Sequence, residues 1–278
     1  MIKTGCLTLN LEKTKDLSSI LSLKKILQIQ ILALLTQIPD GLTNSLVYSD
    51  IPLVPTVTER DLTYRSAIAF KMRKKTNWER EILAEQLFNA LINQPIAENT
   101  HDLKLEVQLI DRIWLTFILD CSSLEVWLLA LSRQLNSGDY LKKRPTTIGI
   151  TENAIAGYCQ YAHARASALL RLAEQEKILP LLPSTESVSI VELSPPMRSL
   201  LEQILRVIDQ VEGKTPENWL KASKNFSQSL LSFERHHRLF NPKNQSQNQL
   251  ACLLLINTRA ILEILLLTKL QIPAPDEL

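Results

Sequence analysis

The sequence predicts an α+β N-terminal domain followed by an all-α helical bundle, in a chain that is mainly α overall. Only 6 of its 278 residues are glycine, and helix interiors avoid glycine because of its conformational entropy. Strand-like alternation is confined to residues before 120, and long apolar helical patterns follow residue 150. We therefore expect an α+β domain over 1–136, a linker over 137–150 and a bundle over 151–278.

Helical and strand-like patterns alternate along the N-terminal half. Helices are expected over residues 17–37, 61–75, 78–93 and 123–135. Strands are expected over residues 51–57, 103–109 and 113–119. Thr58 or Asp61 is the expected N-cap of the second helix, and Ser122 or Ser123 that of the fourth. A tight Asp111-Arg112 turn joins the last two strands.

The pattern of apolar and polar residues changes after residue 136. Asn136-Ser137-Gly138-Asp139 and a basic run ending at Pro145 indicate an exposed linker. Helices are then expected over residues 151–175, 196–212, 216–240 and 246–270.

Bulk composition excludes several classes of protein. Lys and Arg number 31 against 29 Asp and Glu, so any basic surface for nucleic acid must be local. Neither G-x-G-x-x-G nor G-x-x-x-x-G-K-[ST] occurs, which argues against a phosphate-binding loop. The cysteines form no C-x-x-C pair, so we expect no metal, no cofactor and a reduced, cytoplasmic protein.

Two apolar runs have some of the character of membrane spans. Residues 26–38 are too few to cross a bilayer, and residues 250–267 contain Asn257, Arg259 and Glu263. Both are therefore interpreted as buried helices, and no membrane association is expected. Charged residues from Lys3 onward also argue against a signal peptide.

The most informative stretch begins at Tyr158. Tyr158, Tyr161 and Arg165 are spaced i, i+3 and i+7, which places them on one helical face. Two aromatic rings beside a guanidinium form a platform on which unstacked RNA bases can lie. The alternative is a core helix whose Tyr and His side chains are hydrogen-bonded internally, since aromatic stripes commonly only pack.

The run Y-x-Q-Y-A-H-A-R from Tyr158 to Arg165 resembles the helix that opens the anticodon-binding domain of arginyl-tRNA synthetases. The stretch from Leu250 to Leu278 is similar to the DALR-type ending of that domain, where a long helix closes with L-G-I-x-A-P-E-R-M. The two motifs occur in the right order and spacing. The resemblance covers roughly residues 151–278 and implies a DALR anticodon-binding helical bundle.

The N-terminal half resembles the additional N-terminal domain of the same family. Its D-Y-x-x-N-x-A-x-x-L-A-K segment is similar to the stretch from Asp61 to Lys71, and its following P-R-E-x-A-E helix to Glu79–Glu85. The strand Trp114–Leu119 resembles G-x-I-N-F-x-L. The usual Pro-Gly before that strand is replaced by Arg112-Ile113.

The family's ATP-binding catalytic domain lies between these two regions, and here about fifteen residues replace it. No histidine begins an H-I-G-H motif. The run Lys71-Met72-Arg73-Lys74-Lys75 resembles K-M-S-K-S only superficially. The chain therefore resembles two tRNA-contacting domains joined without the enzyme, and we expect no arginine-tRNA ligase activity.

The resemblance implies RNA-contacting positions. Residues that correspond to the anticodon pocket, with Gln160 and His163 in supporting positions, are Tyr158, Gln160, Tyr161, His163, Arg165, Phe233 and Leu278. Basic candidates for the RNA backbone are Arg65, Lys71, Arg73, Lys74, Lys75, Lys142, Lys143, Arg144, Arg235 and Arg238. Positioned cations suffice for phosphate contacts, so these basic residues are equally explained as solvated surface. The His236-His237 pair lacks acidic or Cys partners at metal-binding spacing.

Two functions of different classes remain open. The first is a non-catalytic tRNA-binding protein, with tRNA-Arg as the partner that the resemblance implies. The second is a protein-interaction or regulatory module that reuses the anticodon-binding fold without RNA, a reading that the nearly neutral charge favours.

Overall fold

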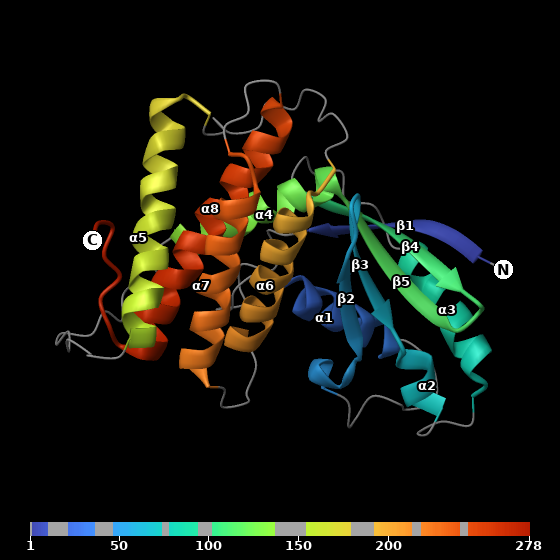
Figure 1. Cartoon of the computed structure of the whole chain (residues 1–278). Helices are drawn as coiled ribbons and strands as arrows, with labels where there is room; N and C mark the ends of the chain where they lie inside the picture. Colours follow the sequence, from blue (N-terminus) through green and yellow to red (C-terminus); the bar gives the residue numbers. More distant parts are fainter. Residues whose placement is uncertain are drawn as a thin grey trace. The chain divides into compact units, whose positions relative to one another are not determined.

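The computed structural model describes residues 2–10, 22–36, 47–73, 78–93, 102–136, 154–178, 192–212, 218–239 and 244–278. The chain divides into two compact units, Met1–Val126 and Trp127–Leu278 (Figure 1). The border between the units falls inside helix α4 (Cys121–Asn136). The expected linker at 137–150 lies outside the described residues.

The first unit contains a five-stranded sheet in the order β1-β4-β5-β3-β2, with every neighbouring pair antiparallel. The strands are β1 (Ile2–Asn10), β2 (Leu53–Val57), β3 (Asp61–Ser66), β4 (Asp102–Ile110) and β5 (Trp114–Asp120). Its helices are α1 (Leu23–Leu35), the 3-10 turn η2 (Tyr48–Asp50), α2 (Ile68–Arg73) and α3 (Arg80–Ile92). The prediction of a sheet before residue 120 in a mainly α chain is confirmed.

Two elements of the first unit differ from the sequence prediction. Residues 61–66 form strand β3 and not the start of a helix, because Leu62, Tyr64 and Ser66 alternate inward while β3 pairs with both β2 and β5. Thr58 therefore caps no helix. Its Oγ1 donates to Asp61 Oδ1 at 2.8 Å and helps to close the turn between β2 and β3. Strand β1 was not predicted.

Both junctions around β5 have clear local causes. Asp111 and Arg112 adopt positive φ values of 52° and 60°, as the central residues of a type I′ turn do, and the N–H of Ile113 donates to the Ile110 carbonyl at 3.1 Å. The predicted turn at Asp111-Arg112 is confirmed, although Ile110 pairs with Trp114 and the loop therefore also includes Ile113. The backbone N–H of Ser123 donates to Asp120 Oδ1 at 2.8 Å. Asp120, directly before α4, therefore caps that helix in place of the expected Ser122 or Ser123.

Gly5 in β1 lies where the sheet meets α3. A Cβ added at this position would overlap Cγ2 of Ile92 and lie 3.1 Å from its Cβ. We expect Gly5→Ala to lower the free energy of unfolding by roughly 1–3 kcal/mol through overpacking. Urea unfolding of Gly5→Ala, Ile92→Ala and the double variant checks this, because the overlap explanation requires Ile92→Ala to relieve most of the Gly5→Ala cost. If the costs of the two substitutions simply add in the double variant, the overlap explanation is contradicted.

The second unit is helical throughout its described part. Its helices after α4 are α5 (Ala154–Gln175), α6 (Pro195–Glu212), α7 (Trp219–His236) and α8 (Gln245–Ile264), and α8 continues as the π-helical turn η4 (Leu265–Leu270). Helix α5 packs against α7 and α8, and α6 packs against the same two helices (Figure 1). All four predicted helices are confirmed.

The segment Gln245–Leu270 is long and apolar enough to cross a membrane by length and composition, with a mean hydropathy of 2.1 over its best window. Of that window, 83% is buried inside the structure. This agrees with the prediction of a buried helix, since the central helix of a bundle meets the same criteria.

Candidate nucleic-acid interface

Helix α5 carries the predicted aromatic and basic face. The side chain of Tyr161 is 50% exposed and that of Arg165 is exposed, whereas Tyr158 is half-buried one turn before them. With 3.6 residues per turn, these three residues lie on one side of the helix. The structure therefore gives Tyr161 and Arg165 the solvent access that contact with a ligand needs.

Arg165 is held by a carboxylate from the neighbouring helix. Its Nε donates to Glu234 Oε1 of α7 at 2.6 Å, and its Nη2 also pairs with that oxygen. This hydrogen bond raises the pKa of the guanidinium. The pair fixes the direction of Arg165, and because it lies near the surface it contributes little to stability. Glu234 therefore places a negative charge beside Arg165 on this face.

Gln160 and His163 lie on another side of α5. Gln160 Nε2 donates to the carbonyl of Pro273 at 3.0 Å, and His163 Nδ1 lies 2.7 Å from the carbonyl of Pro275. At about 100° of rotation per residue, His163 points roughly opposite Tyr161, and Gln160 lies about a quarter turn away from it. The structure thus separates these two supporting positions from the predicted base-stacking residues.

His163 is buried, with 1% of its surface exposed. A carbonyl oxygen only accepts, so Nδ1 carries the proton. In the described part of the chain, Nε2 is buried with no hydrogen-bond partner. Burial is the largest cause that lowers the pKa of His163, and burial also lowers that of His237. Both imidazoles are held in the neutral form.

These two histidines make folding dependent on pH. An unfolded His takes up a proton near pH 6.5, before the folded protein does, so stability is lost as pH falls through about 6.5. We expect His163→Gln, which keeps a donor for Pro275, to gain stability relative to wild type as pH falls from 7 to 5. The gain is at most about 1.4 kcal/mol per pH unit.

Urea unfolding of both proteins at each pH measures this difference. The comparison is needed because burial raises the pKa of Glu125 to about 7. That carboxyl contributes a slope of opposite sign between about pH 4.5 and 7, and it is common to both proteins. If the difference in free energy of unfolding between His163→Gln and wild type stays constant across the pH range, the lowered pKa of His163 is contradicted.

Phe233 lies in the core, whereas Leu278 lies at the surface. Phe233 is fully buried and its ring stacks on His237, with centroids 5.0 Å apart. A buried ring offers no face to an RNA base, so the structure gives Phe233 a core role. Leu278 is 78% exposed.

The basic candidates divide into paired, open and undescribed residues. The guanidinium of Arg65 lies 6.0 Å from the Trp114 ring centre, and Lys71 Nζ pairs with Asp50 Oδ1 at 3.1 Å. In the described part of the chain, the exposed candidates Arg73, Arg235 and Arg238 have neither an ion pair nor a ring contact. Lys74, Lys75, Lys142, Lys143 and Arg144 lie outside the described residues.

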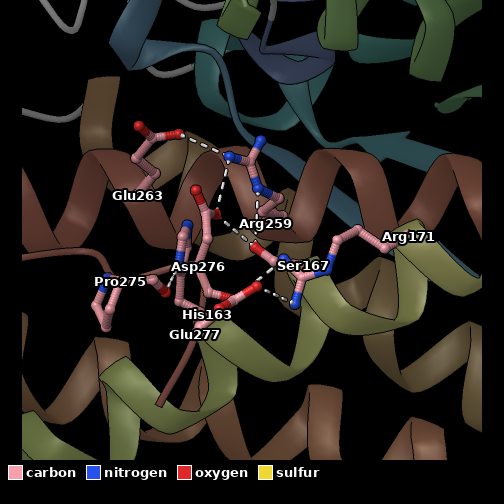
Figure 2. Close-up of polar contacts among 8 residues, drawn as sticks. All are labelled: His163, Ser167, Arg171, Arg259, Glu263, Pro275, Asp276 and Glu277. Carbon is pink, nitrogen blue, oxygen red and sulfur yellow. Dashed lines mark hydrogen bonds and ion pairs between the residues drawn. The ribbon is translucent and has the colours of Figure 1, made fainter.

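A second cluster that the sequence did not reveal lies across α5 and α8. Figure 2 shows the carboxylate of Asp276 accepting from Ser167 Oγ at 2.8 Å and from Arg259 Nη2 at 3.2 Å. Arg259 Nε also donates to Ser167 Oγ at 3.1 Å. The Ser167 hydroxyl, followed by the charge of Arg259, lowers the pKa of Asp276. These residues are 92 and 109 positions apart in sequence, so no local pattern predicts their meeting.

Gln271 begins the segment that carries Asp276. It adopts φ 56° in the left-handed region, and its N–H closes the helical turn at Leu266. Glycine is the favoured residue at this position because a Cβ is strained there. We expect Gln271→Gly to raise the free energy of unfolding by roughly 0.5–1 kcal/mol. Thermal unfolding measures the gain, with Gln271→Ala as the control that keeps a Cβ and should gain nothing.

In the described part of the chain, no group of three or more His, Cys, Asp or Glu side chains gathers into a metal site. No protein-family model matches the chain, and no curated protein is significantly similar to it.

Proposed function

We propose that this chain is a non-catalytic, arginyl-tRNA synthetase-like protein that binds tRNA in the cytoplasm through the α5 face of its helical unit. Tyr161 is the residue on which a base would stack, Tyr158 extends the platform, and Arg165 supplies the cation. The observation that carries the proposal is the exposure of Tyr161 beside Arg165 on one face. Aromatic residues of this kind bind unstacked bases with little sequence preference.

A second observation supports the DALR resemblance on which the proposal rests. In that motif a glycine follows the leucine that closes the long helix. Gln271 occupies the corresponding position and has the left-handed conformation that glycine favours. The backbone form of the ending is thus compatible with the motif although the residue has changed.

Filter binding with total tRNA at 50 mM and 200 mM salt tests the proposal. We expect binding at the lower salt that weakens at the higher, because phosphate contacts release counterions. Tyr161→Ala should abolish most of it. Absence of binding at 50 mM salt would contradict the proposal. Arginine-dependent ATP–pyrophosphate exchange should be absent, and a clear signal would overturn the non-catalytic assignment.

A protein-interaction module is the second candidate, and the Arg165–Glu234 pair favours it. A carboxylate beside the aromatic face repels phosphate and weakens RNA binding, whereas paired charges are common at the rims of protein interfaces. If tRNA fails to bind at low salt and pull-down recovers a protein whose binding requires Tyr161, this second function replaces the first.

A further inference from the structure

The residues 271–278, here called the terminal segment, lie along α5 in an alternating pattern. The side chains of Ile272, Ala274 and Asp276 face the helices, while the carbonyls of Pro273 and Pro275 accept from α5. Side chains that alternate in direction from one residue to the next are typical of an extended chain. The segment is therefore bound as an extended peptide on a helical surface.

The apolar part of this contact is buried. Ile272 retains 2% of its exposure and packs in a cluster with Ala156, Cys159 and Leu266, against which Ala274 also lies. The small side chains of α5 at this point let the segment approach the helix closely. Ile272 and Ala274 thus occupy a shallow apolar surface formed by α5 and the end of α8.

The polar part of the contact follows one stripe of α5. Gln160, His163, Ser167 and Arg171 meet, in that order, the Pro273 carbonyl, the Pro275 carbonyl, the Asp276 carboxylate and the Asp276 carbonyl. Three residues of a helix advance about 4.5 Å, near the roughly 6 Å that two residues of an extended chain span, so Gln160 and His163 match Pro273 and Pro275. Further along α5, Ser167 and Arg171 both meet Asp276, through its carboxylate and its carbonyl (Figure 2).

Two features indicate that the terminal segment can make these contacts without being covalently joined to the end of α8. Beyond Ile272, whose N–H donates to the Leu266 carbonyl at 3.0 Å, the hydrogen bonds shown for the segment come from side chains of α5 and α8. Proline has no N–H to leave unpaired and a fixed φ, which lowers the entropy lost on binding. The same peptide supplied by another molecule can make each of these contacts.

We infer that the surface of α5 and α8 is a peptide-recognition site whose resident ligand is the terminal segment. In trans it takes a ligand of the same class: an extended peptide with an apolar, a small and an acidic side chain separated by prolines. Asp276 provides charge selectivity, since it meets Arg259 and Ser167 at 3.2 Å and 2.8 Å. At about 100° per residue, the stripe of Gln160, His163, Ser167 and Arg171 is centred roughly 115° around α5 from Tyr161. Its contacts do not include Tyr161, so peptide binding at this site does not depend on RNA binding.

The test uses the full chain with a specific protease site inserted directly after Leu270. Before cleavage the segment fills the site at a high effective concentration, so a labelled peptide of the sequence Ile272–Leu278 should not bind. After cleavage and washing, helical circular dichroism should persist and the labelled peptide should bind in a fluorescence anisotropy titration. A peptide with Asp276→Asn should bind several-fold more weakly, because the Asp276 carboxylate accepts from both Ser167 and Arg259. A peptide with Glu277→Gln should bind within about twofold, because Glu277 makes only an exposed ion pair to Arg171 at 3.5 Å.

Two results would overturn the inference. One is no rebinding of the peptide at 1 mM to the cleaved protein that keeps its helical signal. The other is loss of the helical signal when the segment leaves, which would make the segment part of the core. Tyr161→Ala should leave peptide binding unchanged, so failure here and failure of the tRNA proposal are separate outcomes.

Discussion

Phe233→Ala is expected to destabilise the helical unit by about 3–5 kcal/mol, the usual cost of removing a fully buried phenylalanine. The ring has no measurable exposure and stacks on His237 at 5.0 Å between ring centres. Its removal leaves a cavity and also removes the ring that packs against the buried imidazole of His237. Urea unfolding followed by circular dichroism measures the change, which is a large part of the stability of an ordinary domain.

Phe233→Leu separates this core role from a role in RNA binding. Leucine keeps most of the buried volume, and we expect a cost of roughly 1–1.5 kcal/mol and a folded protein. If Phe233 acts only in the core, this variant keeps tRNA affinity within about twofold of wild type. A tenfold loss of tRNA affinity in the folded variant would instead mean that Phe233 takes part in RNA binding.

Tyr161→Ala is expected to weaken tRNA binding by about 1–3 kcal/mol, or roughly 5- to 150-fold, which is the range for one aromatic stacking contact. The fold should be unaffected, because half of the side chain is in solvent. Leu172→Ala is the matched control. It removes another exposed side chain from α5, three turns further along, and should change tRNA affinity by less than twofold.

Glu234→Gln should change tRNA affinity in the opposite direction. It removes the carboxylate that pairs with Arg165, so the charged guanidinium is free to contact phosphate or to stack on a base. We expect a several-fold gain at 50 mM salt that shrinks at 200 mM. An unchanged affinity in Glu234→Gln together with a loss in Tyr161→Ala would mean that Arg165 does not touch the RNA.

Helix positions were predictable because their signals are local. The apolar periodicity of α5, α6, α7 and α8 lies within each segment, and the structure confirms all four helices. Strand β3 was missed because Asp61–Ser66 has only three inward residues and a capping residue at its start. Its partners β2 and β5 decide its conformation, and pairing with β5 joins residues that are 49 to 59 positions apart, from Ser66↔Leu115 to Asp61↔Asp120.

The candidate site was only partly predictable, for the same reason. Helical spacing places Tyr158, Tyr161 and Arg165 on one face, and the structure exposes Tyr161 and Arg165 there. Spacing alone does not show that Glu234 pairs with Arg165. Nor does it show that Gln160 and His163 hold residues 273–275, which are more than a hundred positions away. These contacts depend on which helices become neighbours in the bundle.

The most direct test of the tRNA proposal is to map where RNA touches the chain. Ultraviolet cross-linking of total tRNA at 50 mM salt, followed by mass spectrometry of the protein peptides, reports aromatic residues in contact with bases. We expect the main adduct on the stretch of α5 that contains Tyr158 and Tyr161, and its disappearance in Tyr161→Ala. Adducts confined to other parts of the chain, or none at all, would contradict the account.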